Sequence, residues 1–185
     1  MMTSVSACSK KSSSRMKLET PQELYLRRLS NETVMADSEC FVCRKHRGET
    51  RTSTLPIYQD ALLYAGHAEF PPGEETAYLG YLMVEPRRHV PGLAELTAEE
   101  AQALGLLVAR LSRALKEEEG AEHVYTFVLG DRVPHLHVHL VPRYRGAPPE
   151  YWGVHVDEWP EAPRGDAASV AAVCKRLRRY LEEQK

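Results

Sequence analysis

Apolar residues recur at helical spacing in two segments of the chain. The first stripe consists of Leu104, Leu107, Val108, Leu111 and Leu115. Residues three or four positions apart share one face of an α-helix, and Thr97-Ala98-Glu99-Glu100 forms a capping box before them, with Gly120 suited to end the helix. A second stripe after Asp166 consists of Val170, Val173, Cys174, Leu177 and Leu181. The pattern predicts a long amphipathic helix and a C-terminal helix.

Shorter apolar runs between turn-forming residues predict β-strands. Five such runs lie at 55–58, 61–64, 78–84, 124–129 and 135–141. The last two are expected to form an antiparallel pair. Thr20-Pro21-Gln22-Glu23 has the residues of a helix start, so a short helix over about 21–30 is predicted. Strands, then a helix, then strands indicate an α+β domain with a mostly antiparallel sheet and helices on one side.

Length and charge narrow the class of protein. The 185 residues fit one domain with extensions, which we place at 20–144, after a disordered tail over 1–19 and before a C-terminal extension over 145–185. The net charge of −2 gives no field that favours nucleic acid or an anionic membrane. No apolar run approaches the length of a membrane span, so neither nucleic acid nor a membrane is expected as a partner. The Ser- and Lys-rich start has no apolar signal segment, which predicts a cytoplasmic protein.

The four cysteines give no disulfide framework, and two of them are closely spaced. Cys8 falls in the predicted tail and Cys174 on a helix stripe, so a reducing compartment is expected. Cys40-Phe41-Val42-Cys43 has the spacing of half a zinc site. His46 is close in sequence but would give a cramped site, so His89 is the better further ligand. The alternative is a pair of cysteines without metal.

Three histidines alternate with apolar residues at 135–141, between two prolines. In a strand, Leu136, Val138 and Leu140 would face the core, and His135, His137 and His139 would share the other face. Buried imidazoles need hydrogen-bond partners, so a row of three indicates chemistry rather than packing. A histidine can serve as nucleophile, acid, base or metal ligand. An accidental ladder on an edge strand and an unrelated His-x-His metal site are the alternatives.

This run resembles the signature of the histidine triad superfamily, His-φ-His-φ-His-φ-φ with φ apolar, and it continues into Pro142-Arg143-Tyr144 as in many members. The resemblance covers roughly residues 40–144. It implies a histidine triad fold, with a mostly antiparallel five-stranded sheet, and pairing of two protomers into a homodimer. Histidine at the third position, His139, resembles the hydrolase branch, because the transferase branch carries glutamine there.

The resemblance also implies a metal site and a reaction. Carried over by position, the ligands of a structural zinc ion are Cys40, Cys43, His89 and His135. His137 corresponds to the nucleophile, which attacks the α-phosphorus of a nucleotide to form a nucleotidyl-histidine, and water then releases a nucleoside monophosphate. His139 corresponds to the residue that contacts the phosphate oxygens and can protonate the leaving group.

Two classes of substrate fit this resemblance, namely dinucleoside polyphosphates and nucleoside phosphoramidates. A nucleotide-binding module with little catalysis and a nucleotidyltransferase of a specialised pathway are the alternative functions. The first alternative is motivated by the loop before the triad, where many members have polar phosphate-binding residues and this chain has Gly130-Asp131-Arg132.

Four residues are candidates for binding the nucleotide where the chain departs from the family pattern. Arg132 could bind phosphate by charge or face solvent. Tyr81 replaces a histidine that often precedes the third strand and can donate one hydrogen bond. Tyr64 could line a base pocket and Trp152 could stack on a base or leaving group, although plain packing is the alternative for both. His67 is expected on the surface or in a loop.

Overall fold

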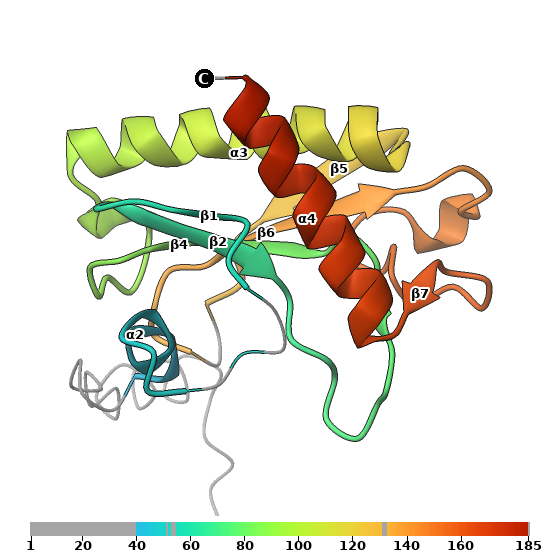
Figure 1. Cartoon of the computed structure of the whole chain (residues 1–185), viewed down its shortest axis with the longest axis horizontal. Helices are drawn as coiled ribbons and strands as arrows, with labels where there is room; N and C mark the ends of the chain where they lie inside the picture. The colour runs from blue at the N-terminus through green and yellow to red at the C-terminus, as the bar shows by residue number, and fades with distance from the viewer. Residues whose placement is uncertain (1–39, 51, 53–54, 131–132, 185) are drawn as a thin grey trace, which may run out of the picture. The chain divides into compact units, whose positions relative to one another are not determined.

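The computed structural model describes residues 40–50, 52, 55–130 and 133–184. The predicted tail over 1–19, the predicted helix over 21–30 and Arg132 lie outside the described residues. Five antiparallel strands form the main sheet, in the order β1-β2-β4-β6-β5 (Figure 1). In that order the strands are Tyr58–Gln59, Leu63–His67, Leu82–Pro86, Val138–Arg143 and His123–Phe127.

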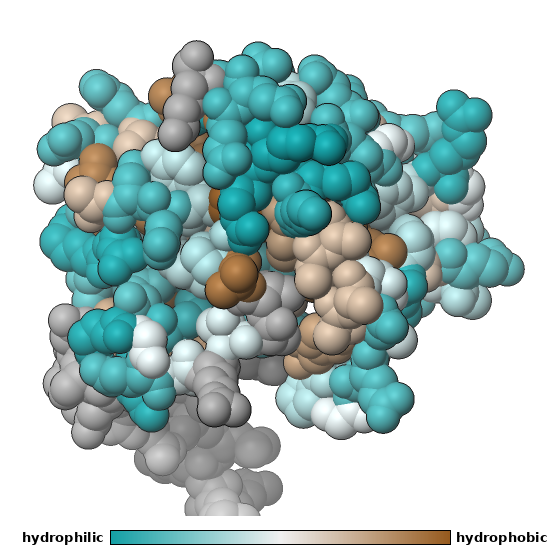
Figure 2. All heavy atoms as spheres, in the orientation of Figure 1, coloured by the Kyte–Doolittle hydropathy of each residue, from teal (hydrophilic) through white to brown (hydrophobic). Residues whose placement is uncertain are grey.

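Two helices cover one face of this sheet. Helix α3, Ala98–Glu119, lies across the strands and α4, Ala167–Glu183, crosses it (Figure 1). Their apolar stripes join the inward residues of the strands in one core cluster. The surface over α3 and the C-terminal half of α4 is mainly hydrophilic, as expected for amphipathic helices with one buried face, whereas the surface over the first half of α4 is moderately hydrophobic (Figure 2). The predicted α+β fold, with its five-stranded sheet, long helix and C-terminal helix, is confirmed.

The helix ends follow from the residues predicted to cap them. The side chain of Thr97 accepts a hydrogen bond from the backbone N–H of Glu100, and the Glu100 carboxylate accepts one from the N–H of Thr97. Gly120 ends α3 in the left-handed conformation, with φ of 72°. The side chain of Asp166 accepts from the N–H of Ser169 at the start of α4. These bonds satisfy backbone groups that a helix end leaves without partners.

Strand alternation divides the central strands between two faces of the sheet. On β4, Leu82 and Val84 are fully buried in the core cluster under the helices. The residues between and after them, Met83 and Glu85, therefore project from the opposite face. On β6, His139 pairs with Met83 in the strand register, so it projects from the same face as Met83 and Glu85. Polar side chains thus gather on the face that the helices leave uncovered.

The predicted strand over 78–84 is wrong as a single strand. Residues Ala77–Tyr78 form β3, which pairs with β7 (Arg164–Gly165) in a separate two-stranded sheet, and only then does β4 begin. Gly80 separates them with a positive φ of 80°, a conformation that breaks an extended chain. The apolar run could not reveal this turn, because the residues on both sides of Gly80 are also apolar.

Other strand boundaries shift for local reasons. The predicted strands over 55–58 and 61–64 become β1 and β2, later in the chain, because the Asp60 carboxylate accepts hydrogen bonds from the N–H groups of Leu62 and Leu63 and so makes the turn. The predicted strand over 124–129 becomes β5, which ends at Phe127. The predicted histidine strand over 135–141 begins only at Val138 and runs on to Arg143.

Three short elements complete the description. Helix α2 spans Phe41–His46, and 3-10 turns span Leu93–Glu95 and Pro149–Tyr151.

Helices α3 and α4 are also linked by charged side chains. Arg176 of α4 bonds to Glu119 of α3, and Arg179 of α4 bonds to Glu118 of α3. Within the described residues, no helix has the length and apolar character needed to cross a membrane.

We predict that Gly80→Ala lowers the free energy of unfolding by about 2–4 kcal/mol. A Cβ at this left-handed position would lie 2.7 Å from the Tyr144 hydroxyl oxygen and 3.1 Å from side-chain atoms of Leu115 and Pro142. Gly105→Ala is the matched control, because a Cβ on the exposed face of α3 meets nothing within 4 Å, and we expect a gain of about 0.5–1 kcal/mol. Urea denaturation measures both free energies of unfolding, and equal changes in the two variants would contradict the account of the turn at Gly80.

Candidate functional site

The three histidines of the run do not share one face. His135 and Leu136 are both almost completely buried, at 0% and 1% exposure, and both precede β6, which begins at Val138, so the two-residue period of a strand does not apply to them. The N–H of His135 donates to the Val133 carbonyl and the N–H of Leu136 to the Val90 carbonyl. This backbone pairing directs His135 away from the other two histidines and toward helix α2.

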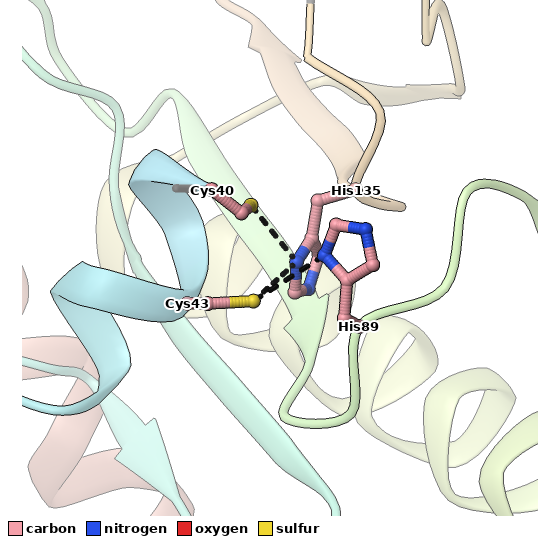
Figure 3. A group of neighbouring side chains, drawn as sticks. All are labelled: Cys40, Cys43, His89 and His135. Carbon is pink, nitrogen blue, oxygen red and sulfur yellow. Dashed lines mark hydrogen bonds between the residues drawn. The ribbon is translucent and has the colours of Figure 1, made fainter. Parts of the chain in front are cut away.

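The structure brings Cys40, Cys43, His89 and His135 together, with one possible ligand atom from each within 4.8 Å of the others (Figure 3). Cys40 Sγ lies 3.5 Å from His135 Nδ1, and Cys43 Sγ lies 3.4 Å from Nδ1 of both histidines. Tetrahedral zinc, with bonds of about 2.3 Å to sulfur and 2.0–2.1 Å to nitrogen, holds these atoms roughly 3.5 Å apart. The donor set and its spacing therefore fit a zinc ion.

The ring of His135 is oriented for metal binding by a backbone carbonyl. Its Nε2 lies 2.8 Å from the carbonyl oxygen of Pro86, which can only accept a hydrogen bond. The neutral ring therefore carries its hydrogen on Nε2 and its lone pair on Nδ1, which faces both sulfurs. Burial lowers the pKa of His135 to about 4, so the imidazole is neutral at pH 7, as a metal ligand must be.

Helix α2 supplies the thiols and also reaches the uncovered face of the sheet. Cys40 is its N-cap and Cys43 lies in its first turn. At its other end, His46 Nε2 lies 2.8 Å from Glu85 of β4, and Lys45 Nζ lies 2.6 Å from the same carboxylate. His46 is thus engaged outside the Cys and His cluster. His89 follows β4 and completes the cluster from the other side (Figure 3).

Glu85 is a buried charge that the sequence did not reveal, with only 3% of its surface exposed. Burial raises the pKa of its carboxyl group, but the hydrogen bonds from His46 and Lys45 and the charge of Lys45 outweigh burial and hold the pKa below its usual value. Its partners lie about 40 positions away in the chain. No local pattern could therefore have paired them.

His137 lines a large cleft, and a backbone carbonyl fixes the tautomer of its ring. Its Nδ1 donates a hydrogen bond of 2.7 Å to the carbonyl oxygen of His135. In the neutral ring Nε2 then carries the lone pair, which is the electron pair that a nucleophile needs. His137 is among the residues that line a cleft of about 950 Å³. The same residue that holds the Cys and His cluster therefore also orients His137.

Three segments that are distant in the sequence form the walls of this cleft. Helix α2 contributes Phe41, Val42 and Lys45. The segment from the end of β2 to the start of β4 contributes residues between 67 and 83. The C-terminal extension contributes Asp157, Glu158, Trp159 and Arg164. The cleft therefore depends on an N-terminal helix and a C-terminal segment as well as on the central sheet.

His139 lies beside His137, with 4.9 Å between the two ring centroids. The ring of Phe127 stacks on it at 5.1 Å, and the hydroxyl oxygen of Tyr81 lies 2.8 Å from its Nδ1. Only 6% of His139 is exposed. Burial and then the neighbouring His137 lower the pKa of His139 to about 4, so its ring is also neutral at pH 7.

Two of the candidate nucleotide-binding residues lie outside the cleft lining in the structure. Tyr64 is buried, packs 4.9 Å from the ring of His46 and lies under Lys45. Trp152 is 48% exposed, stacks on the guanidinium of Arg143 at 4.0 Å and donates to the Ala147 carbonyl. Their predicted contacts with a nucleotide stay predictions.

Two further aromatic and histidine side chains change the sequence-based picture. Trp159, rather than Trp152, is the tryptophan of the C-terminal segment that lines the cleft. The expectation that His67 lies on the surface or in a loop is wrong, because His67 belongs to β2 and is 5% exposed. Its Nδ1 donates to the Ala68 carbonyl and its Nε2 accepts from the N–H of Gly80. Because both of its ring nitrogens have hydrogen-bond partners, His67 can be buried in a strand.

A family model described as the HIT domain matches residues 47–146, which is more than half of the chain. The chain belongs to the HIT domain family. This confirms the resemblance that the histidine run indicated, because the matched residues include the whole run. The match ends before the C-terminal segment that contributes Trp159 to the cleft.

Curated relatives of the HIT protein match it over part of their length. A Dictyostelium discoideum protein named bis(5'-adenosyl)-triphosphatase is 34% identical over 70 residues, which are 35% of this chain and 46% of that protein. Protein hit of Bacillus subtilis is 30% identical over 109 residues, or 53% of this chain and 71% of that protein. The chain spans less than half the length of the first curated relatives that it matches.

Solved structures share the HIT fold. A zinc-bound histidine triad family protein from Mycobacterium smegmatis superposes with a TM-score of 0.59 at 19% identity, covering 80% of this chain and 97% of the other. A histidine triad protein from Bradyrhizobium japonicum gives a TM-score of 0.53 at 28% identity, covering 68% and 89%. The arrangement of sheet and helices is therefore that of known HIT proteins.

We predict that His139 makes the HIT protein less stable in mild acid. Its pKa is about 4 in the folded protein and 6.5 ordinarily, so between these values the unfolded chain binds more protons. The free energy of unfolding therefore falls as the pH drops from about 7 to about 4, by up to about 3 kcal/mol from this group. Urea denaturation of His139→Gln should show a correspondingly smaller fall with pH than the parent.

His155→Gln is the control for this measurement, because the side chain of His155 is exposed and its Nδ1 lies 3.1 Å from the exposed carboxylate of Glu158. Its stability should follow that of the parent at every pH. Parallel stability curves for the parent and His139→Gln between pH 7 and pH 4 would contradict the account of His139.

Proposed function

We propose that this HIT protein hydrolyses nucleotides at the α-phosphate through a covalent nucleotidyl-histidine intermediate. The observation that carries the proposal is the state of His137, a residue of the cleft wall whose Nδ1 donates to the His135 carbonyl, so that Nε2 keeps its lone pair. Family membership supports the proposal, since one relative is named a bis(5'-adenosyl)-triphosphatase. A neutral imidazole attacks phosphorus well and also leaves well, so it divides one displacement into two.

The proposed reaction has two balanced displacements. In the first, His137 Nε2 forms a bond to the α-phosphorus while the bond from phosphorus to the leaving group breaks, and the leaving group takes a proton from solvent. In the second, a water oxygen attacks the same phosphorus, the bond to Nε2 breaks, and the water proton goes to solvent. The products are a nucleoside monophosphate and the free leaving group, and the enzyme is unchanged.

The charges in the cleft favour one class of leaving group. Among the described lining residues, carboxylates outnumber cationic side chains, and the two cationic ones, Lys45 and Arg164, pair with Glu85 and Glu74. A second nucleotide would bring several negative charges into this cleft. An amine, as in a nucleoside phosphoramidate, would meet the carboxylates favourably. We therefore place phosphoramidates before dinucleoside polyphosphates as substrates.

We propose that zinc binds the Cys and His cluster as a structural ion. Four protein ligands close the coordination sphere and leave no position for substrate. A bound ion would link the first turn of α2 to the residues that follow β4 and precede β6. Because α2 also provides Lys45 and Phe41 to the cleft wall, the ion would support the shape of the cleft. Reduced thiols of this kind fit a reducing compartment such as the cytoplasm.

We also propose that two chains of the HIT protein form a homodimer along strand β5. This strand is an edge of the main sheet and pairs only with β6 among the described strands. No residue of β5 is fully buried, and the exposed Val128 and Leu129 follow it. Edge strands with free backbone groups readily pair with a second chain. Sedimentation at the mass of one chain across micromolar concentrations would contradict this proposal.

We predict that brief mixing with adenosine phosphoramidate or diadenosine triphosphate, followed by an acid-free quench, gives a nucleotidyl adduct on the parent protein. The adduct should map to the peptide that contains His137 and should be absent from His137→Ala, because alanine has no ring nitrogen to attack phosphorus. His155→Ala, which removes an exposed histidine, is expected to form the adduct as the parent does. Mass spectrometry of intact protein and peptides measures all three.

The outcomes of this experiment separate the proposed function from its alternatives. Full turnover by His137→Ala would overturn the covalent route. Tight nucleotide binding by the parent with neither adduct nor product would favour a nucleotide-binding module. Transfer of the nucleotide from the adduct to an added phosphate or amine, in preference to water, would favour a nucleotidyltransferase.

For the metal, we predict about one zinc ion per chain of the purified protein and its loss in Cys43→Ser. Cys174→Ser is the matched control, since Cys174 lies on the buried face of α4, in the core, and outside the Cys and His cluster. Elemental analysis of gently purified proteins measures the metal content. Metal-free parent protein, or equal zinc content in Cys43→Ser and Cys174→Ser, would contradict the zinc site.

A further inference from the structure

The two ring nitrogens of His139 differ in their surroundings. Nδ1 lies 2.8 Å from the hydroxyl oxygen of Tyr81. Nε2 is buried and has no hydrogen-bond partner within the described part of the chain. A buried polar atom without a partner costs free energy. Nε2 of His139, in a ring whose centroid lies 4.9 Å from that of the cleft residue His137, would therefore gain free energy from a hydrogen-bond partner.

The hydroxyl of Tyr81 decides which of these nitrogens carries the hydrogen. Among the described residues, its one hydrogen-bond partner is Nδ1 of His139. Nδ1 is thus the described acceptor within reach of the hydroxyl hydrogen, and we infer that the hydroxyl donates and Nδ1 accepts. Burial raises the pKa of Tyr81 to about 12, so the hydroxyl keeps this hydrogen near neutral pH. A neutral imidazole that accepts at Nδ1 carries its own hydrogen at Nε2.

The ring of His139 is also fixed in orientation. Phe127 stacks on it with an angle of 22° between the ring planes, and His137 meets it edge-on. Tyr81 is fixed in turn by its backbone, because the Tyr81 carbonyl accepts a hydrogen bond of 2.7 Å from the N–H of Ala68. The turn at Gly80 precedes it directly. These contacts oppose rotation of the His139 ring, which would exchange the two nitrogens.

We propose that Tyr81 is a positioning residue that holds His139 as the Nε2–H tautomer, so that this N–H donates to an oxygen of the phosphate that His137 attacks. The phosphate contact rests on the proposed function, whereas the tautomer does not. Tyr81 was a candidate for direct phosphate binding from the sequence, and this proposal gives it an indirect role instead. A donor already aimed at the phosphate stabilises charge that develops there during the reaction.

The same arrangement makes His139 a hydrogen-bond donor rather than a general acid. If the neutral ring gave its Nε2 hydrogen to a leaving group, it would have to regain one at Nδ1 from Tyr81. That exchange would leave a tyrosinate in a buried site, which the raised pKa of Tyr81 opposes. The pKa of about 4 for His139 itself leaves little imidazolium to act as the acid at pH 7.

Nitrogen NMR of protein labelled with ¹⁵N-histidine tests the tautomer directly, because protonated and unprotonated ring nitrogens resonate far apart. In the full-length parent we expect His139 to show a protonated Nε2 and an unprotonated Nδ1, with the signals assigned by their loss in His139→Gln. In Tyr81→Phe we expect a mixture of both tautomers. With a nucleoside phosphoramidate, kcat should fall roughly five- to tenfold with a smaller change in KM.

Tyr180→Phe is the matched control, since it removes another tyrosine hydroxyl bond, to Glu117 between α4 and α3, on the other face of the sheet. Its His139 signals and its kcat are expected to equal those of the parent. A protonated Nδ1 on His139 in the parent would overturn the proposal, and so would an unchanged tautomer in Tyr81→Phe. The parent spectrum alone tests the assignment if Tyr81→Phe does not fold.

The two proposals fail in different ways in this experiment. If the parent shows the expected tautomer but no nucleotide yields product, the proposed function is overturned and the tautomer assignment is supported. If the parent hydrolyses nucleotides and Tyr81→Phe changes kcat but not the tautomer, the positioning role of Tyr81 is overturned and the proposed function is supported.

Discussion

The site depends on one buried residue, His135, whose ring and backbone each hold a different part of the structure. Its Nε2 donates to the Pro86 carbonyl at the end of β4, and its Nδ1 faces the thiols of α2. Its own carbonyl accepts the hydrogen bond that orients His137. The ring is 0% exposed, so each of these bonds is made away from water, where leaving one unmade is costly. Movement of His135 would therefore disturb the Cys and His cluster and His137 together.

The cleft follows from what His135 brings together. Helix α2 is placed against the uncovered face of the sheet by the Cys and His cluster at one end and by the Glu85 carboxylate at the other. On the opposite side, the pairing of β3 with β7 carries the C-terminal segment to the cleft, so that Trp159 closes a wall. The HIT sheet supplies the histidines, while two flanking segments supply much of the space around them.

The features that the sequence predicted well are those with a local signal. Both long helices have an apolar stripe and a cap, and the histidine run has a fixed spacing, so their identification needed no distant contacts. The four residues of the Cys and His cluster were found through family resemblance, because their three segments meet only in the folded chain. The turn at Gly80, the Glu85 ion pair and the choice of Trp159 over Trp152 depend on tertiary contacts, which no local pattern records.

The central claim is that His137 takes part covalently, and the stereochemical course at phosphorus tests it most directly. A nucleotide substrate made chiral at the α-phosphorus with one sulfur is hydrolysed in ¹⁸O-labelled water, and the configuration of the product is determined. Each in-line displacement inverts phosphorus, so two displacements through His137 predict net retention. Net inversion would show a single direct attack by water and would contradict the account.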